Sequence, residues 1–234
     1  MFEQQLAMTH DIAFLHTANV HIETFQKLVE DANPSIRVRH DVDESLLSEA
    51  LSEGITESLC TKIDRAMTTA AQTGSQVVVC TCSTIGGVAE NSPQKAPTIS
   101  VRIDRAMADT AVSISEKILI LAAVKSTLEP TQELLSSSST RAGKTPKVNL
   151  QLIDGAWTHF EQGDMAAYYD CIESHINLNH SGFDSVILAQ ASMAPVAGRF
   201  LNSGIRVLAS PEIGVKSAID NIQAVCPYPP HRTT

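Results

Sequence analysis

Short apolar runs alternate with segments of helical periodicity along almost the whole chain. Strands are predicted at 11–17, 36–42, 75–82, 98–103, 117–123, 147–153, 184–190 and 205–209. Helices are predicted across 21–32, 44–74, 104–115, 128–138, 156–180, 195–203 and 211–224. Strands that alternate with helices are typical of parallel sheets covered by helices on both faces. The pattern therefore predicts an α/β fold.

The order of elements repeats in the second half of the chain, which predicts two pseudo-symmetric lobes with parallel sheets flanked by helices. The last strand, 205–209, is followed by a helix, and we find no further partner strand for it in the second half. We therefore expect this part of the chain to return to the first lobe. The predicted division places 1–103 and 206–226 in lobe 1, 104–205 in lobe 2, and 227–234 in a C-terminal tail.

Two of the predicted strands occupy corresponding places in the two halves and end in small or polar residues. One ends in "CTCST" and the other in "LAQASM". In open parallel sheets, ligands bind outside the carboxyl ends of the strands. Two such lobes would enclose an active-site cleft with Cys82 on one wall and Gln190, Ala191 and Ser192 on the other.

Composition and charge narrow the class of protein. With 234 residues, 43% hydrophobic and 18% charged, the chain can bury a globular core. An odd number of scattered cysteines and an acidic N-terminal segment lead us to expect a cytoplasmic protein with reduced thiols. No apolar run approaches the ~20 residues of a membrane helix. The net charge of -9 argues against nucleic acid or an anionic membrane as a partner, whereas local donors can still bind a small anion.

Two cysteines on one strand are the first candidates for chemistry. Side chains alternate along a strand, so Cys80 and Cys82 point to the same side. Cys80 follows three valines and is predicted to be a small buried hydrophobe. Cys82 stands at the strand end, where backbone N–H groups and the following helix favour a thiolate. Such a thiolate could take a proton or attack carbon, while Ser83 and Thr84 bind a carboxylate.

A metal site is the competing use of such a pair of cysteines. It requires two further soft or imidazole ligands, usually in a second close-spaced pair. The remaining cysteines, Cys60, Cys171 and Cys226, are scattered singly. We therefore expect no metal.

The order of elements and these motifs together resemble the aspartate/glutamate racemase superfamily, which includes hydantoin racemases, maleate isomerases and arylmalonate decarboxylases. The resemblance runs from "IAFLHTANV" through "HDVDESLL", "VVVCTCSTIGG", "ILILAAVKSTLEPT" and "VILAQASMAP" to "VLASPEIGV". It implies a homodimeric racemase or isomerase that acts on a small carboxylate without a cofactor. Family members carry Cys-Asn-Thr or a close variant at one strand end, and this chain carries Cys82-Ser83-Thr84 there. The resemblance therefore assigns the catalytic thiol to Cys82.

The second wall departs from the family pattern. Where family racemases read Gly-Cys-Thr or Gly-Cys-Ala, this chain reads Ala189-Gln190-Ala191-Ser192 and has no thiol. Racemisation with two bases needs an acid opposite the base, and Gln190 has no titratable proton. Three functions stay open. They are an isomerase in which another group such as a nearby histidine supplies the acid, a decarboxylase with a single catalytic cysteine, and a carboxylate-binding protein without activity.

Four further residues have both a functional and a structural interpretation. Thr17 ends the first strand and either binds substrate or caps the next helix. His40 follows the second strand and is either an acid or base near neutral pH or a loop tether. Ser126 and Thr127 resemble the carboxylate-binding hydroxyls of the family, and helix capping is the alternative.

Overall fold

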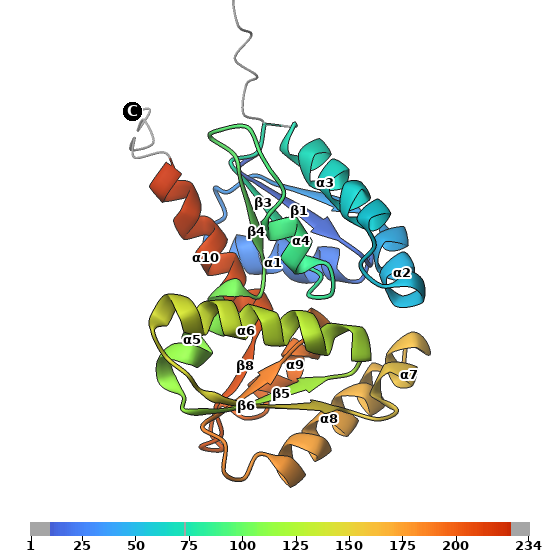
Figure 1. Cartoon of the computed structure of the whole chain (residues 1–234), viewed down its shortest axis with the longest axis vertical. Helices are drawn as coiled ribbons and strands as arrows, with labels where there is room; N and C mark the ends of the chain where they lie inside the picture. The colour runs from blue at the N-terminus through green and yellow to red at the C-terminus, as the bar shows by residue number, and fades with distance from the viewer. Residues whose placement is uncertain (1–9, 73, 226–234) are drawn as a thin grey trace, which may run out of the picture.

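The computed structural model describes residues 10–72 and 74–225, and it contains two lobes, each built around a four-stranded parallel sheet (Figure 1). The first sheet has the order β2-β1-β3-β4, and its strands are β1 (Ile12–His16), β2 (Val38–Val42), β3 (Val77–Cys80) and β4 (Ile99–Arg102). The second has the order β6-β5-β7-β8, with β5 (Lys117–Ala122), β6 (Lys147–Leu152), β7 (Ser185–Leu188) and β8 (Val207–Ala209). The shared order confirms the predicted pair of similar α/β lobes.

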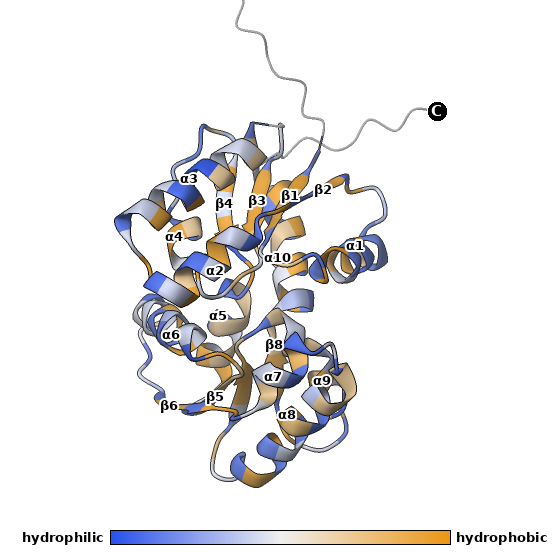
Figure 2. Cartoon of the chain, turned by 90° about the vertical axis from the view of Figure 1, so that its right-hand side faces the viewer, coloured by the Kyte–Doolittle hydropathy of each residue, from blue (hydrophilic) through white to orange (hydrophobic). Residues whose placement is uncertain are grey.

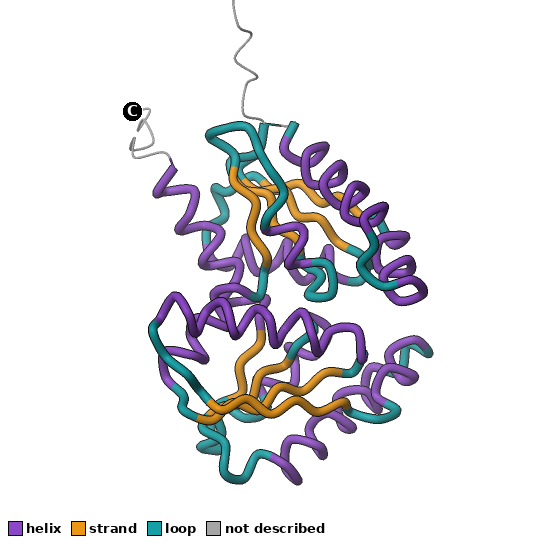
Figure 3. The backbone as a smooth tube through the Cα atoms, viewed as in Figure 1, coloured by secondary structure: helices purple, strands orange, loops and turns teal. Residues whose placement is uncertain are grey.

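Helices cover both faces of each sheet (Figure 3). The first lobe contains α1 (His21–Ala32), α2 (Glu44–Glu53), α3 (Glu57–Ala71), α4 (Gly86–Glu90) and α10 (Ser210–Val225). The second contains α5 (Arg105–Ile114), α6 (Leu128–Ala142), α7 (Ala156–Glu161), α8 (Met165–Asn179), α9 (Ala194–Gly198) and the 3-10 turns η1 (Lys125–Thr127) and η2 (Ala191–Met193). Among the described residues, no helix is long and apolar enough to span a membrane.

The central strands of the first sheet separate two apolar layers. Phe14 and Val79 pack with α1 and α10 on one face, whereas Leu15 and Cys80 pack with α2 and α3 on the other. Burial on both faces explains why β1 and β3 read as continuous apolar runs in the sequence. Figure 2 shows these strands as hydrophobic and the outer surfaces of the surrounding helices as hydrophilic.

The last strand differs from the predicted division of the chain. β8 pairs in parallel with β7, with Val186 opposite Val207, so residues 207–209 lie in the second sheet and not in the first lobe. Only the helix after it returns: α10 packs Val215 and Ala218 into the cluster that contains Phe14. The chain therefore returns to the first lobe one element later than predicted, at α10 and not at β8. The reason is that β7 is the partner strand of β8. The predicted tail, 227–234, lies outside the described residues.

Helix α10 sits directly on the connection between the two lobes. At Gly214, an added Cβ would lie 2.1 Å from the carbonyl oxygen of Ile103, a backbone contact that no larger residue could make. Ile103 immediately follows β4 and precedes α5, so α10 contacts the chain where it passes from one lobe to the other. Helix α10 therefore packs against the chain segment that joins the two lobes.

Candidate active site

A pocket of about 530 Å³, counted with its opening to solvent, lies between the carboxyl ends of the two sheets. The first lobe lines it with residues after β1, at the start of α1, on α2 and after β3; they are Thr17, Ala18, His21, Leu47, Leu51, Thr81, Cys82, Ser83 and Thr84. The second lobe lines it from β5, α7 and β7 with Val124, Thr127, Trp157, Phe160, Gln190, Ala191 and Ser192. All the predicted site residues except Ser126 and His40 therefore line one pocket.

The two cysteines of the β3 strand end differ in their surroundings. Cys80 is fully buried in the core, and burial raises the pKa of its thiol, which disfavours the reactive thiolate. Cys82 is half-buried and lines the pocket. The structure therefore places Cys82, and not Cys80, where a ligand could meet a thiol.

Cys82 is expected to react with iodoacetamide faster than Cys80, because alkylation requires both access and a thiolate. Peptide mapping by mass spectrometry after a short, substoichiometric exposure measures the two rates on the same molecule. Cys60 and Cys171, which are also half-buried, provide internal references outside the pocket. Equal labelling of Cys80 and Cys82, or faster labelling of Cys80, would contradict this assignment of the accessible thiol.

A cluster of neutral polar groups joins the ends of three strands. The hydroxyl of Thr84 lies 3.3 Å from that of Thr127 and 3.5 Å from that of Ser126. Gln190 donates from Nε2 to Thr127 Oγ1 at 3.2 Å and accepts the Ala123 N–H at Oε1 at 2.9 Å. Ser126 thus contacts the cluster through Thr84, although it does not line the pocket. The cluster offers hydroxyl and amide groups to an anion.

Thr17 and Thr127, for which helix capping was the alternative role, do not cap helices in the structure. The N-cap residue of α1 is Val20, so Thr17 does not cap that helix and instead lines the pocket. Thr127 occupies the N-cap position of α6, but its side chain makes no capping hydrogen bond. Both threonines are buried residues that line the pocket.

An aromatic wall that sequence reasoning missed closes the pocket on the second lobe. The rings of Trp157 and Phe160 on α7 stack with centroids 4.7 Å apart, and Phe160 packs on Tyr168 at 5.4 Å. The buried Tyr168 hydroxyl lies 2.9 Å from Ser192 Oγ and fixes that side chain at the pocket. The one signal in the sequence is a pair of large aromatic residues three positions apart on a short helix.

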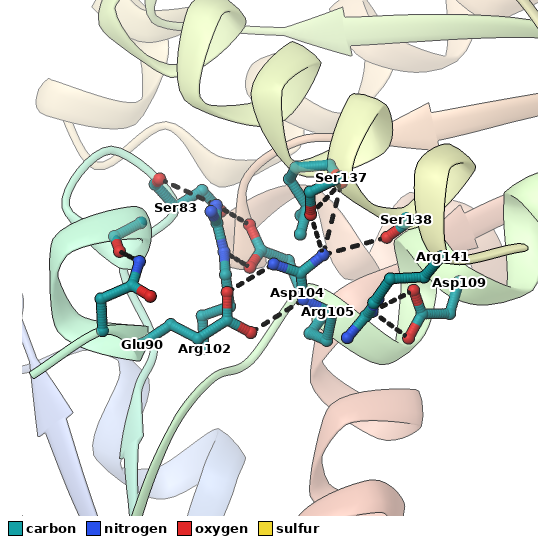
Figure 4. A network of polar contacts seen from close by, with 12 residues as sticks. Ser83, Glu90, Arg102, Asp104, Arg105, Asp109, Ser137, Ser138 and Arg141 are labelled. Carbon is teal, nitrogen blue, oxygen red and sulfur yellow. Dashed lines mark hydrogen bonds and ion pairs between the residues drawn. The ribbon is translucent and has the colours of Figure 1, made fainter.

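A buried ion pair supports the loop that carries Cys82. Arg102 binds Asp104 through two hydrogen bonds of 2.6 and 3.0 Å, and both side chains are almost fully buried (Figure 4). The same guanidinium donates to the carbonyl oxygen of Ser83 at 3.3 Å. A Cβ at Gly86 would lie 3.0 Å from Arg102 Nε, so a larger residue there would require the guanidinium to shift by a few tenths of an ångström. The Ser83 hydroxyl itself has no hydrogen-bond partner among the described residues.

A second arginine ties the lobes together beside this pair. Arg105, at the start of α5, donates to Glu90 of α4 at 2.8 Å and to Ser138 of α6 at 3.0 Å (Figure 4). Glu90 belongs to the first lobe and Ser138 to the second. Arg105 therefore joins the two lobes, while Arg102 contacts the loop that carries Cys82.

His40 lies behind the pocket and does not line it. In the parallel register of β1 and β2 it stands opposite Phe14, and its Nδ1 is 2.8 Å from His16 Nε2. His16 in turn places its Nδ1 2.9 Å from Thr81 Oγ1. Burial lowers the pKa of His16 to about 3 and also lowers that of His40, so the pair is uncharged at neutral pH. His40 therefore does not reach the cleft, where the predicted acid or base would have to lie.

His21 is the histidine that does reach the pocket. It is the first residue of α1, and its ring lies 6.4 Å from the ring of His16 and meets Phe25 edge-on at 6.4 Å. Burial lowers its pKa, so the imidazole is neutral at pH 7. Sequence reasoning placed this residue at the start of a helix and gave it no chemical role. Across residues 10–72 and 74–225, no cluster of three His, Cys, Asp or Glu side chains could hold a metal ion.

Comparisons with solved structures show which proteins share this fold. A glutamate racemase from Bacillus anthracis superposes with a TM-score of 0.68 at 15% identity, covering 93% of this chain and 83% of that one. An aspartate racemase from Picrophilus torridus gives 0.67 at 17% identity over 91% and 94% of the two chains. A mutant of arylmalonate decarboxylase gives 0.58 at 13% identity over 91% and 93%. Scans with family models and with curated protein sequences found no match. The similarity confirms the predicted two-lobed α/β fold.

Proposed function

We propose that this protein is a cofactor-independent isomerase or racemase of a small carboxylic acid, with Cys82 as its reactive thiol. The observation that carries the proposal is the position of Cys82. It lies in a pocket between the lobes, at the carboxyl end of a central strand and beside a cluster of hydroxyl groups. A thiolate at this place can remove the proton from the carbon next to a carboxylate.

The neutral polar cluster is proposed to bind the carboxylate. Thr84 and Thr127 bring two hydroxyls within 3.3 Å of each other, and each can turn its proton toward an anion. Ser83 adds a hydroxyl that has no partner among the described residues. Donors aimed at the carboxylate also stabilise the enolate-like charge that develops as the α-proton leaves.

The rest of the pocket favours an uncharged substituent on the substrate. Its described lining contains no Lys, Arg, Asp or Glu, so neither a second carboxylate nor an ammonium group would find a charged partner there. Trp157 and Phe160 offer a flat apolar surface, since the indole N–H is already bonded to Glu161 at 2.8 Å. We therefore propose a monocarboxylate with an apolar or aromatic group on the reacting carbon.

Decarboxylation is the second candidate, favoured by Gln190 at the place where family racemases carry a second thiol. In that reaction the bond between the reacting carbon and a carboxylate breaks, carbon dioxide leaves, and its bonding electrons form an enolate. The Cys82 thiol then gives its proton to that carbon and becomes a thiolate. A single proton donor is sufficient for this chemistry, and solvent restores the thiol.

Exchange in deuterated water tests the proposed function and separates it from decarboxylation. The panel contains 2-phenylpropionate, phenylalanine, aspartate, glutamate, 5-benzylhydantoin and phenylmalonate. Incorporation of deuterium at the reacting carbon without loss of mass supports an isomerase, and release of carbon dioxide from phenylmalonate supports a decarboxylase. Ligand-induced thermal stabilisation with neither exchange nor carbon dioxide release would leave only the carboxylate-binding alternative.

Gln190→Ala is expected to weaken substrate binding more than it slows the chemical step. The amide holds Thr127 and the Ala123 N–H in place, but it cannot transfer a proton at neutral pH. The KM for the exchanging acid should therefore rise several-fold, whereas kcat falls less. Gln190→Cys places a thiol on the second lobe and is expected to raise racemisation. A loss of kcat at constant KM in Gln190→Ala would argue for a direct chemical role of the amide.

A further inference from the structure

Proton transfer on both faces of a carbon requires two groups, and the family position for the second group holds Gln190. Gln190 uses its amide on Thr127 and on the backbone of Ala123, and it carries no transferable proton. His40, the other sequence-based candidate, is hydrogen-bonded to His16 and Gln26 away from the pocket. The second group must therefore come from elsewhere if the pocket performs racemisation.

The composition of the pocket lining leaves one alternative. Most of the described lining residues are aliphatic, aromatic, hydroxyl or amide side chains. The two that belong to the residue types commonly used as acids and bases near neutral pH are Cys82 and His21. They reach the pocket from neighbouring strands, since β1 leads into His21 and β3 leads into Cys82, and β1 and β3 are paired.

We propose that His21 is the second proton-transferring residue of this site, working with Cys82 on the same substrate carbon. The inference rests on the proposed isomerase function. It extends that function, because it gives the role of the absent second cysteine to a histidine of the first lobe.

The surroundings of His21 suit a neutral base. Its position in the first turn of α1 places it at the positive end of the helix dipole, which disfavours an imidazolium. Burial acts in the same direction. The rings of Phe25 and His16 lie beside it, and His16 is itself uncharged because burial lowers its pKa to about 3. His21 therefore starts the reaction as an imidazole that can accept a proton.

In each turnover, one residue removes a proton from the substrate carbon and the other residue returns one. For one enantiomer, the His21 imidazole takes the α-proton and becomes an imidazolium, while the electrons of the C–H bond form an enolate. The Cys82 thiol then donates its proton to the other face of that carbon and becomes a thiolate. For the opposite enantiomer the thiolate takes the α-proton and the imidazolium returns one. Exchange of a proton with water restores the starting pair.

Single-enantiomer exchange tests this assignment. The variants are His21→Gln and Cys82→Ala, with His175→Gln as the control. Like His21, His175 is a half-buried histidine; its Nε2 lies 2.9 Å from Gln151 Oε1, and it does not line the pocket. The probes are the separate enantiomers of 2-phenylpropionate and of aspartate in deuterated water, followed by NMR and chiral chromatography.

The two variants are expected to lose exchange of opposite enantiomers. His21→Gln loses racemisation by at least about a hundredfold but still exchanges the α-proton of one enantiomer, and Cys82→Ala keeps exchange of the other enantiomer only. His175→Gln racemises as the unmodified protein does. His21→Ala, in case the glutamine disturbs folding, is expected to regain racemisation when free imidazole is added.

Three results would overturn the inference. Racemisation by His21→Gln within about threefold of the unmodified protein would exclude His21 while leaving the proposed isomerase function intact. Loss of exchange for both enantiomers without rescue by imidazole would show a merely structural role. Absence of exchange by the unmodified protein for both probes and for the rest of the panel would overturn the proposed function itself, and the inference with it.

Discussion

Cys82→Ala is expected to abolish racemisation of the substrate, and exchange of the one enantiomer whose α-proton Cys82 removes, while leaving the fold intact. The substitution removes one sulfur atom from a half-buried loop side chain, so it creates no cavity in the core. The chemical loss is large because no other lining residue of the described pocket carries a thiol. We expect racemisation to fall by at least about a hundredfold, measured by chiral chromatography, with the unfolding temperature unchanged within a few degrees.

Cys80→Ala is the matched control for this prediction. Cys80 is the last residue of β3, two positions before Cys82, and has no exposed surface. Its replacement deletes a buried sulfur from the core of the first lobe, so it should lower stability by about 1 kcal/mol or more while activity per folded molecule persists. The opposite pattern, with activity lost in Cys80→Ala and kept in Cys82→Ala, would reverse the assignment of the reactive thiol.

The fold was predictable because the apolar pattern of each segment matches the surface that it buries in the structure. The strands β1, β3, β5 and β7 are short apolar runs since both of their faces are covered by helices. Helix α1 was predicted at its observed bounds, 21–32, because Phe25 and Val29 fall on one face. The position of Cys82 at the pocket followed from the rule that ligands bind at the carboxyl ends of parallel strands.

The parts that were missed depend on contacts between segments distant in sequence. His40 was expected near the rim of the sheet, but the register with β1 places it beside His16, where both rings pack with Phe14. In the sequence, His21 is an ordinary residue at the start of a helix. Only the fold brings it to the same pocket as the loop after β3. The assignment of β8 to the first lobe failed because a strand of three residues carries too little pattern to reveal its partner.

Arg102 is the clearest case of a supporting residue that no local pattern could have revealed. In sequence it is a charged residue within a strand, where alternation would place it on a solvent face. In the structure it is 4% exposed and lies beneath Gly86 and the Ser83 carbonyl, paired with Asp104. Gly86 therefore leaves room for the buried guanidinium, whereas an added Cβ at Gly87 would make only an ordinary contact, 3.6 Å from Arg102 Nη1. The segment after β3 thus contains the accessible thiol of Cys82, the neighbouring hydroxyls of Ser83 and Thr84, and a glycine, Gly86, that leaves room for the supporting guanidinium.

Asp104→Ala is expected to destabilise the protein strongly and to reduce activity. The substitution leaves the Arg102 guanidinium buried without its carboxylate, and breaking a buried pair in this way costs about 3–5 kcal/mol. A guanidinium that lacks Asp104 would also move away from the Ser83 carbonyl, so the Cys82 loop loses its support and the KM for the exchanging acid should rise. Urea unfolding measures the first effect, and initial rates of exchange at low urea measure the second.

Asp109→Ala supplies the matched control for Asp104→Ala. Asp109 forms the same kind of pair with Arg141, at 2.6 Å, but the two side chains are 45% and 56% exposed, and the pair lies away from the Cys82 loop (Figure 4). An exposed pair of this type contributes less than about 1 kcal/mol. Asp109→Ala should therefore unfold near the unmodified protein and keep its KM. Equal losses of stability in the two variants would mean that burial does not set the strength of the Arg102 pair, and an unchanged KM in Asp104→Ala would show that the Cys82 loop holds its shape without it.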